Sequence, residues 1–321
     1  MEDRWAVHLP SSDGPLVVGV FDGHGGSSVA VALAENLCQS LSLALAAAGS
    51  NAEAENAAVL RCFLEADAAV VAADLRCGAR DVRLPGAGST AVVAAFLGDQ
   101  VLLANVGDAR AALGDASGGL LAVTVDQTPS VVEETQRVVA LGGTVTHGLY
   151  DRKPRVAGVL AISRAFGNAG LKPFVTAEPV IMRVPLPEGR SALLLASDGL
   201  FDVLSTEDAL RSVRSRARFP ASALATRAKA MAQAYDNITV LTVHCSQQGA
   251  PLGAPPSRAP SPTLTEPLVS QQPEPEQPAV PLPEPVASPL VASPASLVCL
   301  ALPLSAKRKS KLLASPPQLV T

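Results

Sequence analysis

The chain has 321 residues and a formal net charge of −4, from 25 lysine and arginine residues against 29 aspartate and glutamate residues. This slightly acidic balance excludes the basic footprint of a nucleic-acid-binding protein and a basic membrane-binding face. Hydrophobic residues make up 48% of the chain but aromatic residues only 3%, so the core must consist mainly of Ala, Val and Leu. The five cysteines are scattered without CxxC spacing, which favours reduced thiols over a disulfide framework or a zinc site.

Composition divides the chain near residue 248. Most of the 27 prolines lie beyond this point, together with repeated Ser-Pro pairs. Such a segment cannot bury enough apolar surface to offset the entropy that it would lose on ordering. We therefore expect one folded domain over 1–247 and a disordered tail over 248–321. No signal peptide is visible, and we expect an intracellular protein, cytoplasmic or nuclear. The basic cluster 307–311 fits a nuclear-localisation signal, although such clusters in solvated tails usually have no function.

The domain begins with a buried strand and two helices. The apolar run 16–21 predicts a strand that ends at Asp22. The Ala/Leu-rich stretch 27–48 predicts a helix that polar residues interrupt too often for a membrane span. A second helix is expected over 52–76, with Asn51 as its N-cap.

The centre of the domain has the pattern of antiparallel strands. The runs 90–97 and 100–106 flank a Gly98-Asp99 turn and predict a hairpin. The strands 110–113 and 120–125 continue the meander. Consecutive hairpins indicate antiparallel pairing rather than a doubly wound parallel sheet.

A helix follows, with a capping box from Ser130 to Glu133 and a stop at Gly142-Gly143. Further strands are expected at 156–163, 192–196 and 238–243, and further helices begin near Thr206 and Pro220.

Aspartates mark the ends of four strands. Asp22, Asp108 and Asp198 follow apolar strands, and Asp236 comes shortly before another. Because one antiparallel strand ends at the edge where its neighbour begins, we expect these carboxylates to meet. Packed carboxylates repel one another unless a cation lies between them, and oxygen ligands favour Mg²⁺ or Mn²⁺ over Zn²⁺. Each aspartate alone is more typical of a turn or a helix cap, so only the joint pattern predicts a metal site.

Seven motifs, in the same order, resemble the metal-dependent protein serine/threonine phosphatases of type 2C. They are MED (1–3), VFDGHGG (20–26), GSTAVV (88–93), NVGDARA (105–111), GVLAISRAFGN (158–168), LLLASDGLFDVLS (193–205) and DNITVLTV (236–243). The resemblance implies an α+β fold, in which α-helices flank a sandwich of two antiparallel β-sheets with the metal centre at one edge. It also implies that the substrates are phosphoproteins, and we expect the protein to be a monomer.

The resemblance, applied motif by motif, assigns the metal ligands. Asp22 would bridge two Mg²⁺ or Mn²⁺ ions, and the Gly23 carbonyl would reach one of them. Asp198 and Asp236 would hold one ion, and Glu2 would act on the other. Some family members hold a weaker third ion at the place that Asp108 and Asp198 match here.

The resemblance also implies a mechanism. A metal-activated water would attack the phosphorus of phosphoserine or phosphothreonine in line, and Asp3 would orient the metal-bound waters. The alkoxide that leaves needs a proton, which His24 would deliver as a general acid. No nucleophilic side chain is required.

The sequence departs from the family pattern at four places. The family usually has an arginine that binds substrate phosphate, on a strand just before the Met-Glu-Asp motif, and the given sequence begins at that motif. Asn168 stands where many members have aspartate, Ala109 where they commonly have serine, and Gln127 where histidine is frequent. Without the preceding strand, Glu2 and Asp3 are expected to fray. The chain is then either the truncated start of a longer protein or an attenuated enzyme.

Two other functions stay open. The first is a binding module of the same fold that has lost effective catalysis. The second is a metal-dependent phosphoesterase that acts on a small molecule. Mn²⁺-dependent hydrolysis of an aryl phosphate, measured beside that of a phosphothreonine peptide, would distinguish these functions.

Overall fold

The computed structural model describes residues 1–10, 14–76, 86–148, 152–213, 220–231, 236–247 and 296–304. The chain divides into a compact unit of Met1–Ala250 with Ser293–Thr321 and a second unit, Pro251–Ala292, which lies outside the described residues. The domain boundary near residue 248 and the disorder of the tail stay predictions.

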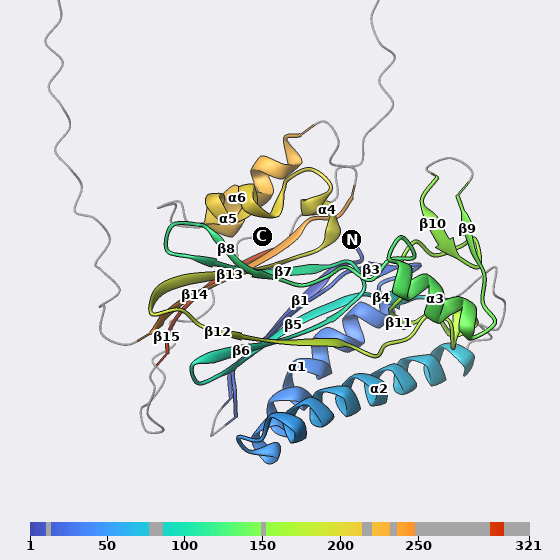
Figure 1. Ribbon diagram of the computed structural model, residues 1–321, viewed down its shortest axis with the longest axis horizontal. Coiled ribbons are helices and arrows are strands. Elements are labelled where there is room, and N and C mark those ends of the chain that lie inside the picture. The colour runs from blue at the N-terminus through green and yellow to red at the C-terminus, as the bar shows by residue number, and fades with distance from the viewer. Residues whose placement is uncertain are drawn as a thin grey trace, which may run out of the picture. The chain divides into compact units, whose positions relative to one another are not determined.

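Two five-stranded sheets pack face to face in the first unit (Figure 1). The first sheet has the order β1-β2-β5-β6-β12, and all its neighbouring strands are antiparallel. The second has the order β15-β14-β13-β7-β8, antiparallel except for the pair β14–β15. These strands are β1 (Arg4–His8), β2 (Val17–Phe21), β5 (Ala91–Leu97), β6 (Gln100–Val106), β7 (Arg110–Asp115), β8 (Leu120–Val123), β12 (Val180–Pro185), β13 (Gly189–Ala196), β14 (Thr239–Gln247) and β15 (Ser296–Leu304).

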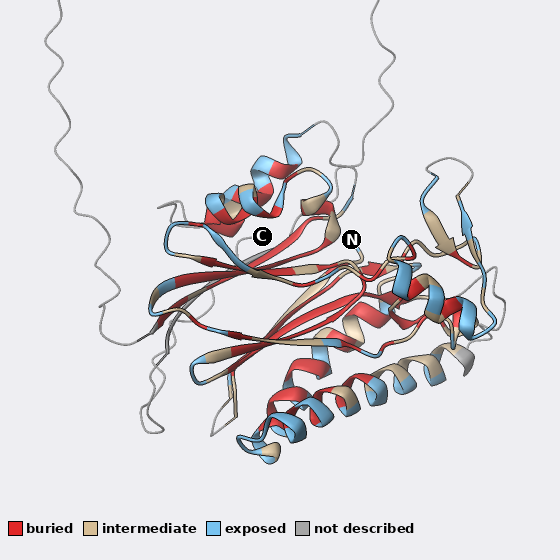
Figure 2. Cartoon of the chain, in the orientation of Figure 1, coloured by how far each residue is buried: buried red, intermediate tan, exposed pale blue. Residues whose placement is uncertain are grey.

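The central strands are buried on both faces. In β2, Val18 and Val20 face the core between the sheets, whereas Val17 and Phe21 belong to the cluster formed with the helices outside. This two-sided burial explains why the strand is a continuous apolar run rather than an alternating one. Figure 2 shows the same burial in red along the strands of both sheets.

Helices cover the outer face of each sheet and complete the predicted α+β sandwich (Figure 1). The first sheet is covered by α1 (Ser28–Ala48) and α2 (Ala52–Arg76), whose predicted positions are confirmed. As expected, Asn51 caps α2: its Oδ1 accepts a 2.9 Å hydrogen bond from the Ala54 N–H. The second sheet is covered by α4 (Asp198–Phe201), α5 (Thr206–Val213) and α6 (Pro220–Lys229).

The helix α1 is long and apolar enough to cross a membrane by length and composition alone. Its side chains show another reason for this hydropathy. Leu33, Leu37 and Leu41 are almost fully buried in the cluster that α1 forms with the first sheet and α2. The helix is therefore a core helix of the sandwich.

A smaller layer contains α3 (Val132–Ala140), β9 (Val145–His147), β10 (Pro154–Val156) and the 3₁₀ turn η1 (Ala169–Leu171). Its core is separate and contains Val138, Val156 and Leu171. A three-stranded sheet, β11-β4-β3, lies beside it. Its strands are β3 (Gly23–His24), β4 (Gly88–Ser89) and β11 (Phe166–Gly167).

The structure corrects two predicted elements. No strand covers 156–163, because the chain turns at Ala157 and Gly158, which have φ of 51° and 72°, and Val156 bridges back to Leu160. The capping box is wrong too. Helix α3 begins after Val131, which makes no side-chain cap hydrogen bond.

One strand lies in the segment expected to be disordered. The apolar run Ser296–Leu304 forms β15, which pairs in parallel with β14 along its whole length. The rest of 248–321, including the basic cluster, lies outside the described residues.

Candidate active site

Strand ends bring the predicted aspartates to one edge of the sandwich. Asp22 follows β2 and Asp108 follows β6. These strands end at the same edge, because both are antiparallel to β5, which lies between them. Asp198 follows β13, and Asp236 precedes β14, the strand that pairs with β13. The N-terminus, α4 and β3 lie at this edge in Figure 1.

The carboxylates at this edge interact electrostatically. Burial raises the pKa of Asp22 well above its usual value, and the charges of Asp3, Asp198 and Asp108 raise it further. Burial and the charge of Asp198 raise the pKa of Asp108 to about 8. Burial also raises the pKa of Asp198 to about 6, and the charge of Asp236 adds to this effect. Such shifts are typical of clustered acids that lack a positive counter-charge.

The donor chemistry of the cluster fits a hard divalent cation. Asp3 Oδ1 and Asp198 Oδ1 are buried without a hydrogen-bond partner, and carboxylate oxygens are the ligands that Mg²⁺ and Mn²⁺ prefer. Within the described part of the chain, however, no three acidic, histidine or cysteine side chains converge into a ready-made ligand group. The described acids thus lie at one edge of the sandwich but do not form a preorganised metal-binding geometry.

The first residues of the chain are held firmly. Asp3 is only 1% exposed, and its Oδ2 accepts a 2.9 Å hydrogen bond from the Ser197 hydroxyl. Glu2 Oε1 accepts a 2.6 Å hydrogen bond from the Gly26 N–H. The expectation that Glu2 and Asp3 fray is therefore wrong, because β1 begins directly after them and their side chains have partners far along the chain.

Gly23, which follows Asp22, lets the backbone of Glu2 come close to the backbone of β3. Gly23 is buried, and a Cβ added to it would lie 2.7 Å from the carbonyl oxygen of Glu2. Only glycine fits there without movement of the backbone. The role predicted for the Gly23 carbonyl stays a prediction.

His24 lies beside the acids on β3. Its Nε2 is 2.9 Å from Oδ1 of Asn168. Burial lowers the pKa of His24, although the Asn168 hydrogen bond and the charge of Glu2 oppose this shift. Asn168, a departure from the family pattern, is thus the partner of the predicted general acid.

Two other polar residues at the edge were not found from the sequence. Ser197 binds Asp3 and also accepts a 2.9 Å hydrogen bond from the Thr239 N–H. Thr90 Oγ1 accepts a 3.3 Å hydrogen bond from the Asp22 N–H. The sequence did offer a signal for both. Ser197 directly precedes Asp198, and Thr90 lies within the motif GSTAVV (88–93).

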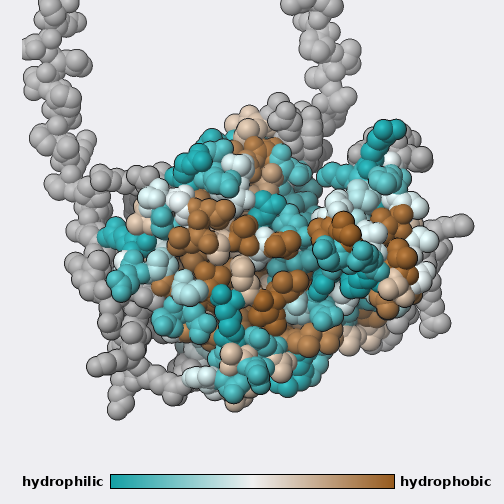
Figure 3. All heavy atoms as spheres, in the orientation of Figure 1, coloured by the Kyte–Doolittle hydropathy of each residue, from teal (hydrophilic) through white to brown (hydrophobic). Residues whose placement is uncertain are grey.

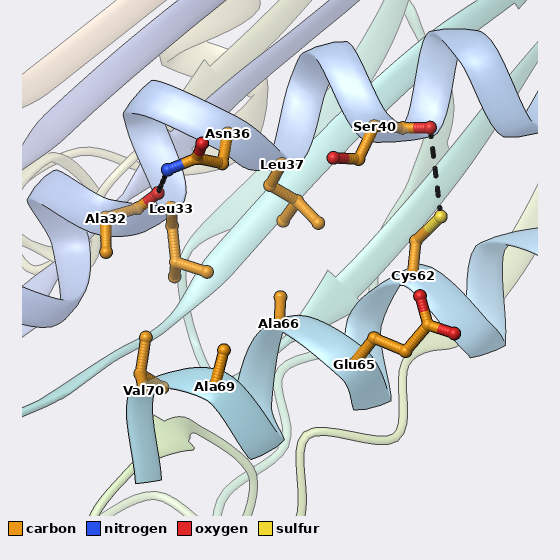
Figure 4. Close-up of a pocket in the computed structure, with 10 residues that line it drawn as sticks. All are labelled: Ala32, Leu33, Asn36, Leu37, Ser40, Cys62, Glu65, Ala66, Ala69 and Val70. Carbon is orange, nitrogen blue, oxygen red and sulfur yellow. Dashed lines mark hydrogen bonds between the residues drawn. The ribbon is translucent and has the colours of Figure 1, made fainter. Parts of the chain in front are cut away.

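A cleft of about 200 Å³ lies elsewhere, between α1 and α2 (Figure 4). It is mostly apolar, and Cys62 on its wall lies 3.9 Å from the Ser40 carbonyl oxygen. Burial raises the pKa of the Cys62 thiol and raises that of Cys38 to about 12. These two cysteines are free and belong to the apolar cluster around α1 and α2.

Figure 3 shows hydrophobic residues gathered across the middle of one face of the molecule, with hydrophilic residues around them. Exposed apolar side chains in the described residues include Leu121, Val139 and Val180.

The protein-family model described as "Protein phosphatase 2C" matches residues 7–239. The chain therefore belongs to the protein phosphatase 2C family. It is 38% identical over 222 residues to "Probable protein phosphatase 2C member 13, mitochondrial" of Oryza sativa subsp. japonica, with 65% of this chain and 54% of that protein covered. It is 36% identical over 227 residues to "Probable protein phosphatase 2C 45" of the same organism, with 67% and 72% covered. The chain thus spans about half the length of the first of these relatives.

Solved structures agree with this assignment. The serine-threonine phosphatase 2C from Toxoplasma gondii has a TM-score of 0.58 and 26% identity, over 71% of this chain and 83% of that one. A C. elegans sex determining protein has a TM-score of 0.64 and 25% identity, over 75% and 60%. The sandwich predicted from the motifs is confirmed by these likenesses.

Proposed function

We propose that this chain is a metal-dependent phosphatase that hydrolyses phosphoserine and phosphothreonine in proteins. The observation that carries the proposal is the cluster of Asp22, Asp108 and Asp198 at one edge of a phosphatase 2C sandwich. Their raised pKa values mean that the cluster favours either protons or added cations. Membership of the family supports the choice of cations.

Six residues are proposed to hold the ions. Two Mg²⁺ or Mn²⁺ ions, when bound, would supply an acidified water and neutralise charge on the phosphoryl oxygens. Their ligands would be Glu2, Asp22, the Gly23 carbonyl, Asp108, Asp198 and Asp236.

The remaining chemistry belongs to Asp3 and His24. Asp3, held by Ser197, would accept hydrogen bonds from water at the site and so fix its orientation. His24 would donate a proton to the serine or threonine oxygen as the bond from that oxygen to phosphorus breaks.

The test compares Asp198→Asn with the matched surface variant Asp208→Asn. Asp208 lies on α5, with 45% of its side chain exposed, and pairs with Arg211. We expect Asp198→Asn to stay folded and to lose most Mn²⁺-dependent turnover of a phosphothreonine peptide, while Asp208→Asn keeps the turnover of the wild type. Undiminished turnover in Asp198→Asn would contradict the proposal.

The wild-type chain separates the other two functions in the same assay. A binding module would hydrolyse neither substrate at any Mn²⁺ concentration. A small-molecule phosphoesterase would hydrolyse p-nitrophenyl phosphate and leave the phosphothreonine peptide intact. Either result would replace the proposed function.

A further inference from the structure

His24 and Asn168 meet across the small sheet β11-β4-β3. His24 pairs with Gly88, and Gly88 pairs with Gly167, the residue before Asn168. A side chain at position 88 would stand between the two, because an added Cβ there would overlap both His24 Nε2 and Asn168 Oδ1. The glycine in the middle strand therefore leaves the space in which the imidazole and the amide make contact.

The orientation of the Asn168 amide follows from its other contact. Its Nδ2 donates a 3.2 Å hydrogen bond to the Gly86 carbonyl, so the atom that faces His24 is Oδ1. An amide oxygen only accepts hydrogen bonds. The His24 Nε2 must therefore carry a hydrogen, and the neutral ring is the Nε2–H tautomer.

The backbone of Asn168 also has an unusual conformation. The residue is fully buried and left-handed, with φ and ψ both 50°. Its N–H donates a 2.9 Å hydrogen bond to the Ala87 carbonyl. Asparagine tolerates this left-handed conformation better than most residues. Because the amide of Asn168 is buried and both its nitrogen and its oxygen are hydrogen-bonded, it holds the His24 ring in one place. Such a conformation is found where the surrounding structure requires it.

We propose that Asn168 is a positioning residue that fixes the tautomer of His24 and so assigns proton transfer to Nδ1. The proposal rests on the proposed role of His24 as general acid. The imidazolium donates its Nδ1 proton to the serine or threonine oxygen, which keeps the electron pair of the breaking bond to phosphorus. The ring becomes the neutral Nε2–H form, which the Asn168 oxygen stabilises.

The first experiment measures the tautomer without any turnover. The chain has only four histidines, so the ring nitrogens of His24 can be assigned by ¹⁵N–¹H NMR of the full chain with Mg²⁺. We expect the Nε2–H tautomer in the wild type and a mixture of tautomers in Asn168→Ala. An Nδ1–H ring in the wild type, or an unchanged ring in Asn168→Ala, would overturn the proposal.

The second experiment uses the leaving group as the readout. A phosphothreonine peptide needs a proton on its leaving oxygen, whereas p-nitrophenyl phosphate does not. With Mn²⁺, we expect Asn168→Ala to lower kcat for the peptide by about 10- to 100-fold at unchanged KM and to leave kcat for the aryl phosphate nearly unchanged. Asn168→Asp keeps an acceptor oxygen and should restore most of the loss.

His24→Ala separates this proposal from the proposed function. If His24→Ala is selective for the peptide and Asn168→Ala is not, the positioning role is wrong and the general acid stands. If His24→Ala lowers both substrates equally, the general-acid role fails, and this proton assignment fails with it. A melting temperature measured for each variant excludes unfolding as the cause, and equal losses on both substrates in a folded Asn168→Ala would also overturn the positioning role.

Discussion

The Ser197 hydroxyl donates a 2.9 Å hydrogen bond to Asp3 Oδ2, across 194 positions of the sequence. The same oxygen accepts from the Thr239 N–H, so that one buried hydroxyl joins the N-terminus to the start of β14. Ser197 itself is fully buried. The acidic edge therefore depends on this serine for its shape as well as on the carboxylates for its charge.

Ser197→Ala should destabilise the protein by about 2–3 kcal/mol, because it removes the hydroxyl that binds a buried carboxylate and a buried N–H. Chemical denaturation measures this loss. Thr242→Val is the matched control on β14, since the Thr242 hydroxyl is buried with no hydrogen-bond partner. We expect that variant to be neutral or slightly more stable. Equal losses in the two variants would show that the Ser197 contact contributes little.

Asp22→Asn should raise the melting temperature in the presence of EDTA. Burial and the charges of its neighbours raise the pKa of Asp22, so the metal-free fold must either bear this repulsion or bind a proton. An amide at position 22 avoids both costs. A gain of about 1 kcal/mol corresponds to roughly 2–4 °C for a domain of this size. The variant should also lose most of the stabilisation that Mg²⁺ gives the wild type. A lower melting temperature in EDTA, or an intact response to Mg²⁺, would contradict this account, and Asp208→Asn serves as the control.

Glu134 should contribute stability that is lost in acid. Burial acts to raise its pKa, but hydrogen bonds from Arg164, Arg137 and Ser163 outweigh burial and hold it at about 2, below the ordinary value of 4.5. Because the folded-state pKa is depressed, the stabilisation is complete above pH 4.5 and disappears as the pH falls toward about 2.

The matching variant is Glu134→Gln. At pH 7 it should be less stable than the wild type by up to about 3 kcal/mol, and this difference should shrink between pH 4.5 and 2. Denaturation curves at several pH values measure the difference. A gap that stays constant over this range would mean that the Glu134 charge does not contribute.

Gly23→Ala should reduce both stability and metal affinity, because the new methyl group would meet the backbone of Glu2. Gly114→Ala is the control, since its Cβ would lie 3.2 Å from a Leu210 methyl group, which can move. Melting temperature and the midpoint of Mg²⁺ titration are the readouts. The two variants should differ clearly, and similar behaviour would show that the backbone at Gly23 can adjust.

Helices and strands whose bounds depend on neighbouring residues in the sequence could be predicted from capping residues and hydrophobic patterns. The bounds of α2 follow from the Asn51 cap and the long helical run, and β2 follows from its uninterrupted apolar residues. The aspartates could be placed together because strand ends in antiparallel sheets coincide. The prediction of a strand over 156–163 was wrong because Ala157 has a left-handed backbone conformation, which alanine gives no reason to expect.

Long-range contacts could not be predicted in the same way. The two-residue strands β3, β4 and β11 are too short to show any periodicity. Glu2 and Asp3 looked like fraying residues because their partners, Gly26 and Ser197, are brought near only by the finished fold. The Asn168 contact with His24 is of the same kind.

That contact has a consequence for folding. His24 and Asn168 are 144 positions apart, whereas the β5–β6 hairpin closes over a two-residue turn. Closing the longer loop costs more chain entropy and must wait for the sheets to assemble. The hydrogen bond to His24 should therefore be among the last to form, after the hairpins of the sandwich are in place. A folding intermediate that lacks this contact would have the native sheets, while the ring of His24 could still rotate.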